Sequence, residues 1–136
     1  MFEILEHTAD IGFRARGRTM AELFAEAAMA LSGIYAELDQ IEARLEYPIE
    51  ARGEDRESLL VNWLGEVLFW IDGRRVVFSR FRVDAISTHE VRGLAFGEPY
   101  DPTRHRAKLL VKAVTYHQLK VTETAEGWMA EVYLDV

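Results

Sequence analysis

The order of apolar and polar residues predicts a chain built mainly of β-strands, with two helices in its first half. Strand patterns, either alternating or continuously apolar, cover residues 2–6, 11–16, 41–51, 76–85, 91–96, 108–115, 119–121 and 128–134. The alternation changes phase between Phe78 and Phe81, which predicts a β-bulge near Ser79 and Arg80. The last two stretches flank residues 124–127 and are expected to form a hairpin.

The first helix is predicted to begin at Thr19. A threonine suits the N-cap position, and Glu22 three residues later completes the pattern of a capping box. One face of the helix is apolar and consists of Met20, Leu23, Phe24, Ala27, Leu31 and Ile34. Gly33 is expected close to the C-terminal cap.

The second helix is predicted to begin after Asp55 and to stop at Asp72-Gly73. Apolar residues occupy much of its circumference, at Leu59, Leu60, Trp63, Leu64, Val67, Leu68, Trp70 and Ile71. Such a wide apolar surface indicates a largely buried helix. We interpret Trp63 and Trp70 as core residues, with a partner-binding face as the alternative.

The strands predict how the domain is arranged. Residues 41–51 contain Pro48, which cannot donate to a sheet ladder, so this strand should lie at an edge or contain a bulge. Residues 108–115 alternate little, which predicts that both faces are covered. Residues 97–102 are rich in Gly and Pro and predict a stiff loop. Without a linker or an internal repeat, the chain is predicted to form a single α+β domain over residues 1–136.

Composition excludes several classes of protein. The chain has 136 residues, of which 49% are hydrophobic and 29% are charged, enough apolar material for a core. No apolar run approaches the roughly 20 residues of a membrane span, and no targeting segment is recognisable, so we expect a cytoplasmic protein. The absence of cysteine excludes disulfides and thiolate catalysis. The net charge of −7 argues against strong direct binding to nucleic acid, because the basic residues are scattered among acidic ones.

The residues that carry chemistry favour an oxygen-only metal site. Motifs for serine hydrolases, nucleotide-binding loops and zinc proteases are missing, and the histidines lack metal-ligand spacing. Four carboxylates, Asp10, Glu98, Asp101 and Asp135, and the terminal carboxylate of Val136 are hard ligands that suit calcium, magnesium or manganese.

Clustered carboxylates repel one another unless a cation balances them. Lys112, in a strand predicted to be covered, is the candidate for that charge. In the alternative interpretation, Asp10 caps a turn and Asp135 is an exposed residue near a fraying end.

The sequence also resembles the archease family. The resemblance lies in ordered motifs, namely His7-Thr8-Ala9-Asp10, residues 53–60 leading into Trp63-Leu64, residues 97–101, residues 111–117 and the terminal Leu134-Asp135-Val136. Because these motifs run in the same order across nearly the whole chain, they are more specific than a single tetrapeptide.

The resemblance implies a fold and a function. The fold would be a curved, mixed and mostly antiparallel sheet packed against two helices. The protein would be a non-enzymatic activator of the RtcB-type RNA ligase of tRNA splicing and RNA repair, promoting ligase guanylylation and multiple turnover through a metal-bearing acidic tip. An archaeal member of the family is also linked to modulation of a tRNA methyltransferase, which is an alternative partner.

The resemblance further implies a set of site residues. A divalent metal, calcium first and magnesium or manganese as alternatives, would be held by Asp10, Asp135 and the carboxylate of Val136. Lys112 would belong to the same functional pocket. The remaining pocket residues would be His7, a loop organiser, together with Glu98 and Asp101, whose motif matches a family loop.

Two other classes of function remain open from the residues alone. A metal-dependent hydrolase would use the clustered carboxylates and a lysine, and would turn over substrate without a partner. A chaperone-like interaction module would bind unfolded clients and tolerate substitutions at Asp10 and Asp135.

Overall fold

The computed structural model describes residues 1–6 and 11–136. Its strands are β1 (Phe2–Glu6), β2 (Ile11–Gly17), β3 (Leu45–Arg52), β4 (Val76–Ile86), β5 (Glu90–Pro99), β6 (Ala113–Thr124) and β7 (Gly127–Asp135). Its helices are α1 (Met20–Tyr35) and α2 (Arg56–Leu68), with a short 3-10 turn at Leu38–Gln40 and a π-helical turn at Phe69–Gly73. None of the helices in these described ranges is long and apolar enough to cross a membrane.

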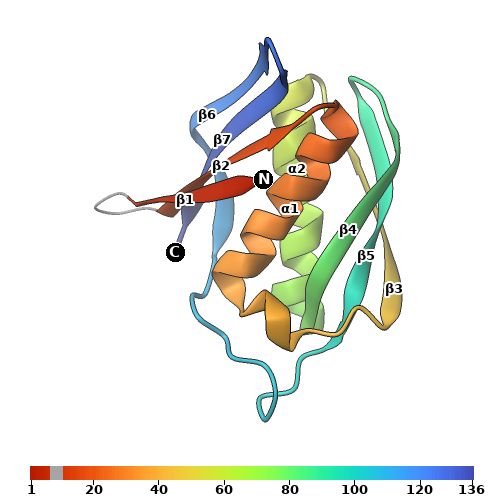
Figure 1. The fold of residues 1–136 in the computed structure, drawn as a ribbon, viewed down its shortest axis with the longest axis vertical. Coiled ribbons are helices and arrows are strands. Elements are labelled where there is room, and N and C mark those ends of the chain that lie inside the picture. The colour runs from red at the N-terminus through yellow and green to blue at the C-terminus, as the bar shows by residue number, and fades with distance from the viewer. Residues whose placement is uncertain (7–10) are drawn as a thin grey trace.

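The strands form two separate antiparallel sheets with both helices between them (Figure 1). One sheet has the order β1-β2-β7-β6 and the other has the order β3-β5-β4. Helix α1 packs against β2 and β4, whereas α2 packs against β3 and β6. The predicted α+β class is confirmed, but the single curved, mixed sheet is wrong. Because each helix is apolar on more than one side, each must be covered by both sheets.

Helix α1 begins as predicted and continues past Gly33, which was expected close to its C-terminal cap. The hydroxyl of Thr19 accepts a hydrogen bond from the backbone N–H of Glu22 at 3.1 Å. The helix continues through Gly33 to Tyr35, and Ala36 is the C-cap. Ile34 and Tyr35 are each only 5% exposed, so burying them outweighs the helix-breaking tendency of glycine, which is about 1 kcal/mol.

Helix α2 is largely buried, as the sequence predicted. Asp55 accepts from the backbone N–H of Ser58 at 2.8 Å, and the Ser58 hydroxyl lies 3.1 Å from the backbone nitrogen of Asp55, so the two residues form a capping box. Trp63 is fully buried, and its indole N–H donates to the carbonyl of Phe24 in α1 at 3.0 Å. That bond satisfies the polar atom of the largest side chain in the core.

Several strand predictions are confirmed. Strand β3, which contains Pro48, lies at the edge of its sheet. The pairing of β4 with β5 shifts between Phe78 and Arg80, where the bulge was expected. Strands β6 and β7 form the predicted hairpin, with Thr124 paired to Gly127. These features follow from local sequence signals, which the tertiary structure leaves unchanged.

Two stretches differ from prediction. Residues 97–99 continue β5, and Gly97 pairs with both Leu45 and Phe78. This glycine permits close approach of the Val77 carbonyl rather than ending the strand. Residues 108–112 are not in a strand, and β6 instead runs from Ala113 to Thr124 with an irregular pairing between Thr115 and Lys120.

Candidate functional site

At one end of the four-stranded sheet, the last residues of β1 and β7 lie beside the first residues of β2 and β6. Ile11, the first residue of β2, pairs with Glu6 of β1 on one side and with Leu134 of β7 on the other. Leu134 in turn pairs with Val114 of β6. Both residues that flank 7–10 therefore lie in the same row as the end of β7. His7 and Asp10 themselves lie outside the described residues.

The C-terminal residues and Lys112 lie at this same sheet end. Asp135 is the last residue of β7, is exposed, and pairs with Ala113. The backbone N–H of Lys112 donates to the carbonyl of Asp135 at 2.8 Å. Val136 is half-buried and packs against the core. Asp135, Val136 and Lys112 are therefore brought together, although Lys112 precedes β6 and the other two residues lie at the end of β7.

The prediction that Lys112 lies within a covered strand is wrong. Val111 takes the inward position, at 1% exposure, so the next residue faces outward and the Lys112 side chain is exposed. Because its ammonium group stays in water, Lys112 avoids the free-energy cost of burying a charge. It can therefore present its charge at the sheet end.

The donor set at the sheet end suits a hard cation. The carboxylate of Asp135 and the carboxylate predicted at Val136 are oxygen ligands on adjacent residues, of the kind that calcium, magnesium and manganese prefer. Among residues 1–6 and 11–136, no group of three or more His, Asp or Glu side chains lies close enough to hold a metal. A site here needs a further ligand, and the remaining candidate, Asp10, lies outside the described residues.

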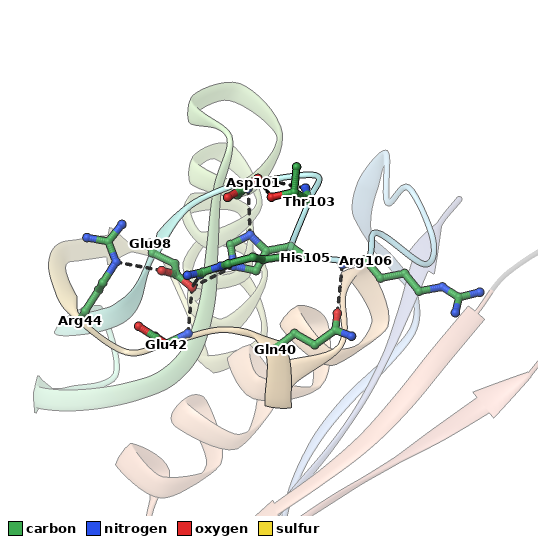
Figure 2. A network of polar contacts seen from close by, with 9 residues as sticks. Gln40, Glu42, Arg44, Glu98, Asp101, Thr103, His105 and Arg106 are labelled. Atoms are coloured by element: carbon green, nitrogen blue, oxygen red, sulfur yellow. Dashed lines mark hydrogen bonds and ion pairs between the residues drawn. The ribbon is translucent and has the colours of Figure 1, made fainter.

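Glu98 and Asp101 belong to a second cluster, centred on a buried carboxylate (Figure 2). Glu98 is 1% exposed. Its Oε1 atom accepts from Nε of Arg44 at 2.8 Å. Its Oε2 atom accepts from the backbone N–H of Glu42 at 2.9 Å, from Nε2 of His105 at 2.8 Å, and from the guanidinium of Arg104. Both oxygens are thus occupied by donors from within the chain.

These donors keep Glu98 ionised despite its burial. Burial by itself raises the pKa of the Glu98 carboxyl, because it disfavours the charged form. The hydrogen bonds from Glu42, Arg44 and His105 and the charge of Arg104 outweigh burial and lower the pKa from 4.5 to about 2. The carboxylate is therefore negative throughout the physiological pH range.

His105 is held as one neutral tautomer. Its ring is buried, with 3% of the residue exposed, and Nδ1 accepts from the backbone N–H of Asp101 at 2.8 Å. An acceptor at Nδ1 carries no proton, so the proton is on Nε2 and is donated to Glu98. The ring also packs against Tyr100, with 5.9 Å between ring centroids.

Asp101 organises the turn that delivers His105. Its Oδ1 atom accepts from the backbone N–H and the hydroxyl of Thr103, at 2.9 and 2.7 Å, and these bonds lower the pKa of the Asp101 carboxyl. Its carbonyl accepts from the N–H groups of Arg104 and His105 at 3.0 and 2.7 Å. Glu98 and Asp101 therefore both contact the ring of His105.

Arg44 and Arg104, which both donate to Glu98, were not predicted from the sequence. Arg104 is adjacent to His105 in the sequence, and this adjacency could have indicated that both residues contact the same carboxylate. Arg44 is 54 residues from Glu98, and its place on the polar face of the strand predicted over residues 41–51 indicated only exposure.

Comparison with known proteins places the chain among archeases. The model of the Archease protein family (MTH1598/TM1083) matches residues 2–136. The chain is 40% identical to the protein archease of Methanosarcina mazei, with 99% of this chain and 95% of that protein covered. It is 41% identical to the protein archease of Pyrococcus furiosus and 44% identical to that of Methanopyrus kandleri, with 98% and 99% of those proteins covered.

Solved structures share the fold. The solution structure of protein 1598 of Methanobacterium thermoautotrophicum is 32% identical, covers 99% of this chain and 98% of that one, and gives a TM-score of 0.77. The crystal structure of a Thermotoga maritima archease, described as a possible chaperone, covers 97% and 94% with a TM-score of 0.66. At 22% identity the latter supports the fold alone.

Proposed function

The chain belongs to the archease family, and we propose that it is an accessory protein that activates an RtcB-type RNA ligase in tRNA splicing and RNA repair. It would promote guanylylation of the ligase and allow repeated turnover, without catalysing a reaction itself. The arrangement of Lys112, Asp135 and Val136 at one sheet end is the observation that carries this proposal. It brings Lys112 and Asp135, two exposed charged residues from separate family motifs, to the same end of the sheet.

We further propose that this sheet end holds a divalent cation. Asp10, Asp135 and the terminal carboxylate of Val136 would be its ligands, and calcium is the first candidate, with magnesium and manganese as alternatives. The pairing of Ile11 with Leu134 supports this assignment, because it joins the residue after Asp10 to the residue before Asp135. When bound, the cation supplies positive charge that neutralises mutual repulsion among the carboxylates.

The proposed activation follows from differential binding. A partner shifts the ligase toward a guanylylation-competent state only if it binds that state better than the others. An exposed lysine beside ionised carboxylates gives this protein a surface of mixed charge, which can orient it on the ligase. Lys112 and the carboxylates would therefore contact the ligase, and His7 would organise the loop that carries Asp10.

The test is RNA sealing by the cognate ligase, with the ligase substoichiometric to RNA and with GTP and manganese present. We expect the wild-type protein to convert about one turnover per ligase into many, and Asp135→Asn to lose this effect while remaining folded. Glu126→Gln is the matched control, because Glu126 is an exposed carboxylate in the turn between β6 and β7, at the other end of the same sheet. If wild-type protein leaves turnover unchanged, ligase activation is refuted.

The metal assignment is tested separately by calcium-dependent thermal stability. A cation that binds only the folded state raises the melting temperature in proportion to the logarithm of its concentration. Millimolar calcium should therefore stabilise the wild-type protein and Glu126→Gln but not Asp135→Asn. Equal stabilisation of all three proteins would place calcium elsewhere.

A further inference from the structure

The connection from β5 to β6, residues 100–112, contains no helix or strand yet ends at Lys112. Loops of this length, above roughly 12 residues, are uncommon in compact domains and usually serve a function. In Figure 1 the loop extends beyond the ends of the helices before it reaches β6. Its course must be set by individual contacts, because no ladder of backbone hydrogen bonds sets it.

Backbone contacts fasten the loop to the end of α1 and to β7. The N–H of Lys108 donates to the carbonyl of Tyr35 at 2.7 Å, and Ala107 forms an isolated β-bridge with Ala36. The N–H of Lys112 then meets the carbonyl of Asp135 at 2.8 Å. These contacts hold the second half of the loop. Which residues make them depends on where the first half of the loop is attached to the protein.

The first half is held by two backbone N–H groups and by one buried side chain. The N–H of Tyr100 donates to the carbonyl of Arg75 at 2.7 Å, and the N–H of Arg106 donates to the side-chain oxygen of Gln40 at 3.1 Å. His105 inserts into the protein and donates to Glu98, while its other ring nitrogen accepts from Asp101. Glu98 also binds Arg44 and the N–H of Glu42 (Figure 2). This carboxylate therefore joins three separate segments, namely the end of β5, the loop, and the stretch that precedes β3.

We propose that Glu98, acting through His105, is a positioning residue that sets the register of loop 100–112 and so places Lys112 beside Asp135. The importance of that placement rests on the proposed function, whereas the placement itself does not. A buried ion cluster is weak evidence for stability alone, because apolar residues of similar volume often stabilise a core as well. The Glu98 carboxylate, in contrast, accepts from four donors with defined directions, and these bonds allow only one path of the backbone through this region.

The test compares Glu98→Gln with Leu64→Ala in hydrogen exchange measured amide by amide. Leu64 is fully buried in α2 and is not part of the loop, so its truncation controls for general destabilisation. Denaturant concentrations are chosen so that both variants have the same free energy of unfolding. We expect the Lys112 amide to exchange at least tenfold faster in Glu98→Gln than in Leu64→Ala, with equal exchange in β2. Equal exchange at Lys112 would overturn the inference.

A second pair of variants keeps the test decisive if Glu98→Gln fails to fold. The Arg44 side chain is 52% exposed, so Arg44→Ala should weaken the network without unfolding the domain. We expect faster exchange at Lys112 in Arg44→Ala and a rate close to wild type in Arg44→Lys, which retains the charge. No difference between these two variants would contradict positioning through Glu98.

RNA sealing separates this inference from the proposed function. If wild-type protein activates the ligase, Glu98→Gln at saturating concentration should lower turnover several-fold, while Leu64→Ala retains it. Retained turnover in Glu98→Gln would overturn the inference that the placement of Lys112 matters. If wild-type protein fails to activate, the proposed function falls, and hydrogen exchange at Lys112 still decides whether Glu98 positions the loop.

Discussion

Glu98→Gln should destabilise the protein at neutral pH and have almost no effect near pH 2. The carboxylate accepts hydrogen bonds from four donors and donates none. A glutamine amide has one oxygen and one NH₂ group, and that NH₂ must face a donor in this site. The variant therefore loses the charge and leaves at least one buried donor without an acceptor.

The magnitude follows from the pKa of Glu98, which falls from 4.5 to about 2. One pKa unit corresponds to about 1.4 kcal/mol, so the full shift would correspond to about 3 kcal/mol. The side chains of Arg44 and Arg104 are 52% and 44% exposed, so solvent screens part of their interaction. We therefore expect a loss of about 2 kcal/mol at pH 7.

The pH dependence has a defined direction. Because the folded-state pKa of Glu98 lies below the unfolded value, ionisation favours folding. The contribution is complete above about pH 4.5 and disappears as the pH falls toward 2. In Glu98→Gln this contribution is missing at every pH, so the difference between the two proteins should shrink on acidification.

Urea unfolding followed by tryptophan fluorescence, at pH 7 and at intervals down to pH 2.5, measures this difference. Asp84→Asn is the control, because Asp84 pairs with Arg82 at an exposed position of β4 and should show little pH-dependent loss. A gap between wild type and Glu98→Gln that stayed constant with pH would refute the argument. It would mean that shape, and not charge, determines the role of Glu98.

Three substitutions test the packing of the fold by the same unfolding assay. Gly65→Ala should stabilise by about 0.5–1 kcal/mol, because Gly65 is exposed within α2 and a Cβ there meets no described atom within 4 Å. Gly12→Ala should destabilise by about 1–3 kcal/mol, because its Cβ would lie 2.6 Å from the Tyr133 ring. Trp63→Phe should also cost about 1–3 kcal/mol, because it leaves a cavity and removes the bond to the Phe24 carbonyl. A stabilising Gly12→Ala, or a neutral Trp63→Phe, would contradict the packing described here.

Features governed by neighbouring residues could be predicted from the sequence. The caps at Thr19 and Asp55 are local, since each side chain bonds a backbone N–H three residues later. The hairpin between β6 and β7 and the edge position of Pro48 follow from turn chemistry and from the missing N–H of proline. In each case the evidence lies within a few residues of the feature.

Features that depend on distant partners could not be predicted in the same way. The division into two sheets depends on which strands pair with one another on each side of the helices, and a strand pattern does not specify its partner. Gly97 suggested a loop, but the lack of a side chain allows the carbonyl of Val77, in the neighbouring strand β4, to approach closely. Lys112 was predicted to be buried because residues 108–115 were assigned to one covered strand, whereas β6 begins only at Ala113.

The candidate carboxylates illustrate how tertiary contacts distinguish residues that composition treats alike. Glu98 and Asp135 were both plausible metal ligands in the sequence, but every Glu98 oxygen already accepts donors from the protein. A cation could use Glu98 only by displacing two arginines and a histidine from a buried site, at a large desolvation cost. Asp135 is exposed at the end of β7 and keeps its oxygens available to solvent. Calcium stabilisation should therefore be lost in Asp135→Asn and retained in Glu98→Gln, because neither Glu98 nor the loop supplies a proposed ligand.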